Sequence, residues 1–187
     1  MKELSLNILD IAQNSLRAEA AHVEIDLTED ETTLTFTIRD DGFGMTPEFL
    51  SRVTDPFSTT RTTRSVGLGL PFLKMEAEMT GGSFQIESKT REASPDAHGT
   101  VVSATFVKTH IDFIPLGNII DTLCTLVMGA GDVDVTFAHR MPNREVSFST
   151  REMREMLGEE IPLGAPEVIA WLRGYLEDAY AADSISS

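Results

Sequence analysis

The chain has 187 residues, 41% of them hydrophobic, which is enough for one sizeable core or for one domain with a small second one. Its formal net charge of -15 argues against nucleic acid as the main partner, because phosphate binding needs a basic face. A single cysteine, Cys124, excludes a disulfide framework and a thiolate zinc cluster within one chain.

The first predicted element is an amphipathic helix from Ser5 to about Glu19, with apolar residues at helical spacing. Its polar residues form a neighbouring stripe that includes Asp10 and Asn14, one turn apart. A carboxylate and an amide oxygen so placed suit a magnesium ion that keeps most of its waters and also holds phosphate oxygens. An ordinary solvated helix face is the alternative interpretation.

Two alternating runs, residues 21–27 and 33–39, then predict a β-hairpin. The second run leads into Asp40-Asp41-Gly42-Phe43-Gly44-Met45, so the Asp40 carboxylate leaves the sheet edge pointing at whatever occupies the turn. Gly42 and Gly44 flank Phe43 without side chains, which allows a positive φ and the close approach of a flat ligand. A plain Asp-Gly turn explains the same residues.

A short helix is predicted near Thr46, followed by a hydroxyl-rich loop over residues 55–66 that carries two arginines. This loop runs into Gly67-Leu68-Gly69-Leu70, where a further helix begins, and the free N–H groups of such a start can hold an anion. We expect the loop to close over a polyphosphate. A simple loop-to-helix junction is the alternative.

Two more strands are predicted at residues 83–88 and 99–106, separated by a polar turn region. Thr100 begins the second of them, and its hydroxyl can meet the base of a ligand from the floor of the sheet. A β-branched strand residue without such a role is equally consistent with the local sequence.

Residues 108–187 are predicted to form a small α+β appendage of unknown role. It has a buried helix over residues 115–128 and hairpin strands at 133–138 and 145–148. Ser149 and Glu152 have the spacing of a capping box that starts a helix to about Leu157, and residues 166–180 form another helix. We expect this part to pack against residues 1–107 or against a partner.

The order of these motifs over about a hundred residues resembles the ATP-binding domain of histidine kinases, gyrase-type topoisomerases, Hsp90 chaperones and MutL-type repair proteins, the GHKL superfamily. An Asp-x-x-x-Asn helix, a strand ending in Asp-x-Gly-x-Gly, a Phe-Ser-Thr-Thr-Arg loop before Gly-Leu-Gly-Leu and a closing Gly-Thr strand carry the resemblance. It implies a two-layer α/β sandwich over residues 1–107, in which a mixed sheet backs three helices and ATP lies under a mobile lid.

The resemblance also implies roles for single residues. Asn14 matches the asparagine that binds magnesium, Asp40 the carboxylate that accepts a hydrogen bond from the adenine amino group, and Thr100 the threonine near the base. The other matching positions lie under the nucleotide, in the lid or at its hinge: Gly42, Gly44, Phe57, Thr59, Thr60, Arg61, Gly67, Leu68, Gly69 and Leu70.

Asp10 departs from the family pattern. Members that hydrolyse ATP or phosphorylate serine usually carry glutamate there as a general base, whereas two-component histidine kinases often carry asparagine. An aspartate keeps the charge but is one methylene shorter, so it orients a water or hydroxyl from farther away. We expect this departure to bear on catalytic turnover and to leave ATP binding intact.

Three functional hypotheses follow from the resemblance. The first is a Mg-ATP-dependent protein kinase or ATPase in signalling, related to the stand-alone serine kinases that act as anti-sigma factors, with Asp10 as the base. The second is a non-catalytic, nucleotide-gated module that binds a protein partner. The third is the ATP-binding subunit of a split histidine kinase, because no dimerisation helix precedes the first helix and none of the four histidines lies on a long amphipathic helix.

The location is predicted from what the sequence lacks. No signal peptide opens it, and no apolar run approaches the ~20 residues that a membrane-spanning helix needs. The single cysteine fits a reducing compartment. We therefore expect a cytoplasmic protein that does not insert into a membrane.

Overall fold

The computed structural model describes residues 3–55, 69–158 and 160–182. The helices are α1 (Leu4–Arg17), α2 (Pro47–Val53), α3 (Gly69–Met79), α4 (Ile119–Ala130), α5 (Thr150–Leu157) and α6 (Pro166–Ala181). The strands are β1 (His22–Glu29), β2 (Thr33–Asp40), β3 (Ser83–Lys89), β4 (Gly99–Val107), β5 (Asp134–Met141) and β6 (Arg144–Ser149). None of the helices in these ranges is long and apolar enough to cross a membrane.

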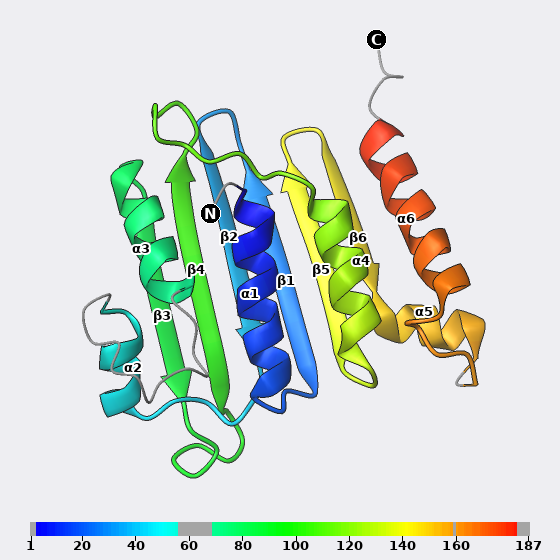
Figure 1. The fold of residues 1–187 in the computed structure, drawn as a ribbon, viewed down its shortest axis with the longest axis horizontal. Helices are drawn as coiled ribbons and strands as arrows, with labels where there is room; N and C mark the ends of the chain where they lie inside the picture. Colours follow the sequence, from blue (N-terminus) through cyan, green and yellow to red (C-terminus); the bar gives the residue numbers. More distant parts are fainter. Residues whose placement is uncertain (1–2, 56–68, 159, 183–187) are drawn as a thin grey trace.

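The six strands form one mixed sheet in the order β3-β4-β2-β1-β5-β6 (Figure 1). β1 and β5 pair in parallel, and the other neighbouring strands pair antiparallel. The register places Thr100 of β4 opposite both Asp40 of β2 and Ser88 of β3. These three residues therefore form one row across three strands, at the end of the sheet where β2 stops.

Helices α1, α3 and α4 cover one face of the sheet (Figure 1). Alternation along β1 and β2 explains why, since alternate residues of these strands, such as Ile25 and Phe36, are fully buried beneath the helices. The opposite face carries polar side chains that bond across strands, as between Thr37 and Ser103 at 3.0 Å. The predicted two-layer α/β sandwich with a mixed sheet is confirmed.

The ends of two helices match local sequence signals. Thr46 caps α2 by accepting a hydrogen bond from Phe49 N at 3.3 Å, with Pro47 at the first helical position. The helix predicted from residue 115 instead begins at Ile119, because Gly117 has a φ of 77° and Asn118 caps the helix through Asp121 N at 3.0 Å.

The capping box predicted at Ser149 is wrong. Ser149 precedes α5, but its side chain makes no capping hydrogen bond, because this residue is still paired with Thr136 as the last residue of β6. The neighbouring hydroxyl of Thr150 instead accepts a hydrogen bond from Val135 N at 2.8 Å. The Thr150 side chain at the start of α5 is thus hydrogen-bonded to β5.

Residues after 108 extend both layers of the fold. β5 continues the sheet beside β1, and α4 packs beside α1, where Thr122 Oγ1 donates to Ser5 O at 3.2 Å. α6 lies beyond β6 (Figure 1), and the Tyr175 hydroxyl donates to Ser147 O of that strand at 2.9 Å. The sheet is therefore continuous across residue 107, where the sequence predicts a domain boundary.

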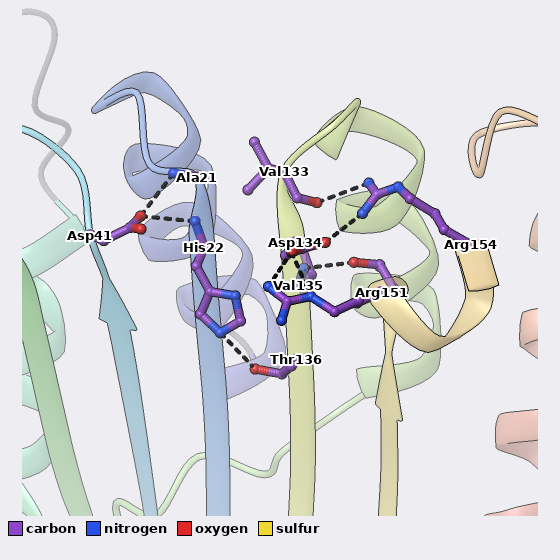
Figure 2. Close-up of polar contacts among 10 residues, drawn as sticks. Ala21, His22, Asp41, Val133, Asp134, Val135, Thr136, Arg151 and Arg154 are labelled. Atoms are coloured by element: carbon purple, nitrogen blue, oxygen red, sulfur yellow. Dashed lines mark hydrogen bonds and ion pairs between the residues drawn. The ribbon is translucent and has the colours of Figure 1, made fainter. Parts of the chain in front are cut away.

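A cluster of hydrogen bonds fixes the start of β5 (Figure 2). Asp134 accepts from Arg151 Nη2 at 2.8 Å and from Arg154 Nη1 at 2.6 Å. Burial alone would raise the pKa of Asp134, but its hydrogen bond to Arg151 and the charges of both arginines hold the pKa below its usual value. Arg154 also donates to the carbonyl oxygens of Gly131 and Val133.

The two arginines should contribute unequally to stability. The Arg154 side chain is 22% exposed, and its loss leaves two carbonyls and the Asp134 carboxylate short of a donor, so we expect Arg154→Ala to lower the free energy of unfolding by about 1–3 kcal/mol. Arg151 is 67% exposed, so Arg151→Ala should cost less than about 1 kcal/mol. Urea denaturation measures both, and equal losses would contradict this ranking.

Candidate functional site

A cavity of about 290 Å³ opens where β2 and β4 meet α1 and the start of α3. Its walls are mainly apolar, with Ile11, Ile38, Phe43, Leu70 and Val102 among the lining residues. The polar side chains of its lining belong to Asn14, Ser15, Arg17, Asp40 and Thr100. Ser15, Asp40 and Thr100 are joined by hydrogen bonds and form one polar end. An apolar slot with a few convergent polar groups is typical of a small-molecule site.

The Asp40 carboxylate is held by three hydrogen bonds from three different parts of the chain. Ser15 Oγ, on a side chain that is only 3% exposed, donates to Oδ2 at 2.6 Å. Oδ1 accepts from Gly42 N at 3.0 Å and from Thr100 N at 3.2 Å. The carboxylate is therefore a fixed acceptor at the polar end of the cavity.

The turn after Asp40 needs glycine because backbones meet there. Gly44 has a φ of 73°, and a Cβ atom on it would lie 1.9 Å from Lys89 O. A Cβ atom on Gly42 would lie 2.7 Å from Ala18 O, while its φ is not positive, so the positive φ expected at both glycines occurs at Gly44 alone. At both glycines, the atom that approaches most closely is a backbone oxygen of this chain.

Asp10 does not line the cavity but lies against the first residue of α3. A Cβ atom on Gly69 would be 2.0 Å from Asp10 Oδ2, so the missing side chain is what makes room for the carboxylate. The N-terminal end of a helix carries a partial positive charge, and a carboxylate beside it is stabilised. The predicted catalytic carboxylate and the predicted phosphate helix are thus in direct contact.

Asn14 lines the cavity, and its Oδ1 accepts a hydrogen bond from Arg17 Nη1 at 2.9 Å. Within residues 3–55, 69–158 and 160–182, no group of three or more His, Cys, Asp or Glu side chains is placed to hold a metal ion. Asn14 can supply one amide oxygen, which suits a cation that takes its other ligands from water and phosphate. Such a cation would compete with Arg17 for this oxygen.

Eight of the fourteen residues assigned to the site from the sequence can be located. Asn14, Asp40, Gly44, Leu70 and Thr100 line the cavity, while Asp10, Gly42 and Gly69 lie next to it. Their roles toward a nucleotide stay predictions. The remaining predicted residues lie outside the described part of the chain: Phe57, Thr59, Thr60, Arg61, Gly67 and Leu68.

Three side chains that support the site were not predicted. Ser15 orients Asp40, Ser88 Oγ lies 2.8 Å from Thr100 Oγ1, and His98 Nδ1 lies 2.6 Å from Gly42 O. Because a carbonyl oxygen only accepts, the His98 contact requires the proton on Nδ1. Ser15 directly follows Asn14 in α1 and is buried. Its position next to a predicted site residue is the one sequence signal that could have identified it.

Comparison with known proteins identifies the family of this chain. The model of the histidine kinase-, DNA gyrase B-, and HSP90-like ATPase matches residues 1–110. Sporulation kinase A of Bacillus subtilis (strain 168) is 34% identical over 70 residues, which are 37% of this chain and 11% of that protein. A putative sensor histidine kinase NtrY-like of Rickettsia bellii (strain RML369-C) is 27% identical over 90 residues, 48% of this chain and 15% of that protein.

Among solved structures, the Aquifex aeolicus MutL ATPase domain complexed with ADP is similar, with a TM-score of 0.52 and 13% sequence identity. The similarity covers 79% of this chain and 64% of that one, and it shows a shared fold.

Substitution of Gly44 should lower the free energy of unfolding by more than the cost of its positive φ alone. Gly81 has a φ of 79° with nothing within 4 Å of an added Cβ, so Gly81→Ala should cost only the left-handed strain of about 1–2 kcal/mol. Gly44→Ala adds the overlap with Lys89 O, and we expect a total loss of about 2–5 kcal/mol. Thermal and urea unfolding compare the two variants. Equal losses would show that the turn can move away from Lys89.

Proposed function

Because the chain belongs to the histidine kinase-, DNA gyrase B-, and HSP90-like ATPase family, we propose that the cavity bounded by α1, β2, β4 and α3 binds Mg-ATP. The observation that carries this proposal is the Asp40 carboxylate, fixed by Ser15, Gly42 and Thr100 at the polar end of an otherwise apolar slot. An adenine ring fits such a slot, with its flat faces against apolar side chains and its amino group donating to the carboxylate.

In this proposal the phosphates lie at the start of α3. Gly69 begins the 11-residue helix α3, and the first N–H groups of a helix have no partner within the helix and can hold an anion. Asn14 would give one oxygen to magnesium, which supplies charge neutralisation of the phosphate oxygens when bound. Asp10, in contact with Gly69, would stand beside the terminal phosphate and orient a water or a hydroxyl.

We further propose a role in signalling, as a Mg-ATP-dependent protein kinase or ATPase similar to the stand-alone serine kinases that act as anti-sigma factors. The names of the curated relatives, a sporulation kinase and a putative sensor histidine kinase, support a signalling role, although the matched segments are small parts of both. Phosphoryl transfer needs little beyond positioning and charge, which Asp10, Asn14 and the start of α3 would supply. The acceptor would be a protein.

One observation favours a second candidate, a nucleotide-gated module with little chemistry. Asp10 packs against Gly69 and is absent from the cavity lining, and it is shorter than the glutamate of catalytic family members. In the split-kinase alternative, the acceptor histidine would come from another chain. His22 and His139 lie in strands, and His98 and His110 lie outside helices and strands, so none of them has the helical setting of such an acceptor.

Asp40 should decide nucleotide affinity. We expect Asp40→Asn to weaken binding of a non-hydrolysable ATP analogue by about 1–3 kcal/mol, because the amide is a weaker acceptor for the adenine amino group. Calorimetric titration measures this, and Asp178→Asn, at an exposed position of α6, is the matched control and should bind like the unmodified chain. Unchanged affinity in Asp40→Asn would show that the base does not lie where we place it.

Asp10 should separate the two candidate functions. In a single-turnover experiment with Mg-ATP, following released phosphate and label on protein, we expect Asp10→Asn to keep nucleotide binding and to abolish turnover. Turnover at the original rate would remove Asp10 from the mechanism. Tight binding without turnover in the unmodified chain would instead favour the nucleotide-gated module.

A further inference from the structure

Ser88 lies just outside the cavity but contacts two residues that line it. Its Oγ is 2.8 Å from Met45 N, 3.1 Å from Gly99 O and 2.8 Å from Thr100 Oγ1. Met45 and Thr100 are both part of the cavity lining. The register of β3, β4 and β2 makes this arrangement possible, because Ser88, Thr100 and Asp40 share one row of the sheet.

All three contacts of Ser88 are hydrogen bonds in only one arrangement of the two hydroxyl protons. Met45 N can only donate, Gly99 O can only accept, and a serine hydroxyl has one proton. In that arrangement the Ser88 proton goes to Gly99 O and the Thr100 hydroxyl donates to Ser88 Oγ. Donation from Ser88 to Thr100 instead would leave Gly99 O without the Ser88 donor, so we assign the arrangement that satisfies all three partners. Thr100 Oγ1 then has only its lone pairs to offer to a ligand.

The neighbouring groups at this end of the cavity are acceptors as well. The Asp40 carboxylate accepts from Ser15, Gly42 and Thr100 N, and the Ser15 proton is used in doing so. A ligand must therefore bring donors to Asp40 and Thr100. The exocyclic amino group of adenine carries two N–H donors. A 6-oxo purine sets a carbonyl oxygen at the same position against these acceptors, and its one donor on this edge is the neighbouring N1–H.

We infer that Ser88 is a specificity-determining positioning residue, which selects 6-amino over 6-oxo purine nucleotides by holding the Thr100 hydroxyl as a hydrogen-bond acceptor. This inference rests on the proposed nucleotide site and goes beyond it, since it concerns a side chain that does not line the cavity. Without the Ser88 oxygen, the Thr100 proton is free to turn toward the ligand and to donate to a 6-oxo group.

The test compares ADP with inosine diphosphate, whose base carries a 6-oxo group, on the full chain. Calorimetry gives the ratio of the dissociation constant for inosine diphosphate to that for ADP. We expect Ser88→Ala to lower this ratio about 3- to 10-fold, the value of one hydrogen bond gained by the 6-oxo base. Ser88→Thr keeps the hydroxyl in a strand that tolerates β-branching and should keep the original ratio.

A second variant, Thr100→Val, distinguishes the positioning role of Ser88 from a general loss of structure. Thr100→Val removes the hydroxyl through which Ser88 acts, so it should lower the ratio by itself, and adding Ser88→Ala to it should change the ratio no further. A Ser88→Ala ratio equal to that of the unmodified chain overturns the inference, as does a Ser88→Ala effect that persists beside Thr100→Val. If Ser88→Ala does not fold, an unchanged ratio in Thr100→Val overturns it.

The same titrations distinguish this inference from the function on which it rests. Binding of neither nucleotide by the unmodified chain would refute the proposed nucleotide site and the inference together. Binding of ADP with a ratio that Ser88 and Thr100 do not control would refute the inference alone.

Discussion

The hydrogen bonds to the Asp40 carboxylate are the constraint on which the rest of the site depends. They join α1 through Ser15, the glycine turn through Gly42 and the start of β4 through Thr100. Three segments far apart in the sequence are thereby held around one charged group, so the cavity has its polar end in place before any ligand binds. Such preorganisation lowers the cost of ordering side chains on binding. It also explains why the glycines of this turn contact protein backbone, since the turn must pack tightly to present the carboxylate.

Much of this arrangement could be predicted from the sequence, because the signals are local. Alternation of apolar residues predicts β1, β2 and β4, and a strand that stops at Asp40 before a glycine turn predicts a carboxylate at the sheet edge. The role of Ser88 could not be predicted, because it depends on the register between β3 and β4, which no local pattern encodes. The contact of Asp10 with Gly69 likewise needs the packing of α1 on α3.

Residues 108–187 likewise make contacts that local sequence patterns do not predict. Its two strands were predicted as a hairpin in an appendage, and in the structure that hairpin is the edge of the main sheet. The parallel pairing of β5 with β1 joins residues about a hundred positions apart, as between His22 and Asp134, and the local pattern of one sequence offers no sign of such a partner. The polar cluster of Asp134 with Arg151 and Arg154 then fixes the entry into that strand (Figure 2).

The position of α6 has a consequence for how the molecule behaves at high concentration. An edge strand with free backbone groups is a template on which a strand of another molecule can add. At β6 the Tyr175 hydroxyl donates a hydrogen bond to the Ser147 carbonyl oxygen, and α6 lies beyond the strand (Figure 1). At the other edge, β3 exposes the charged side chains of Glu87 and Lys89. One edge is thus shielded by a helix and the other by charge, which disfavours aggregation through the sheet.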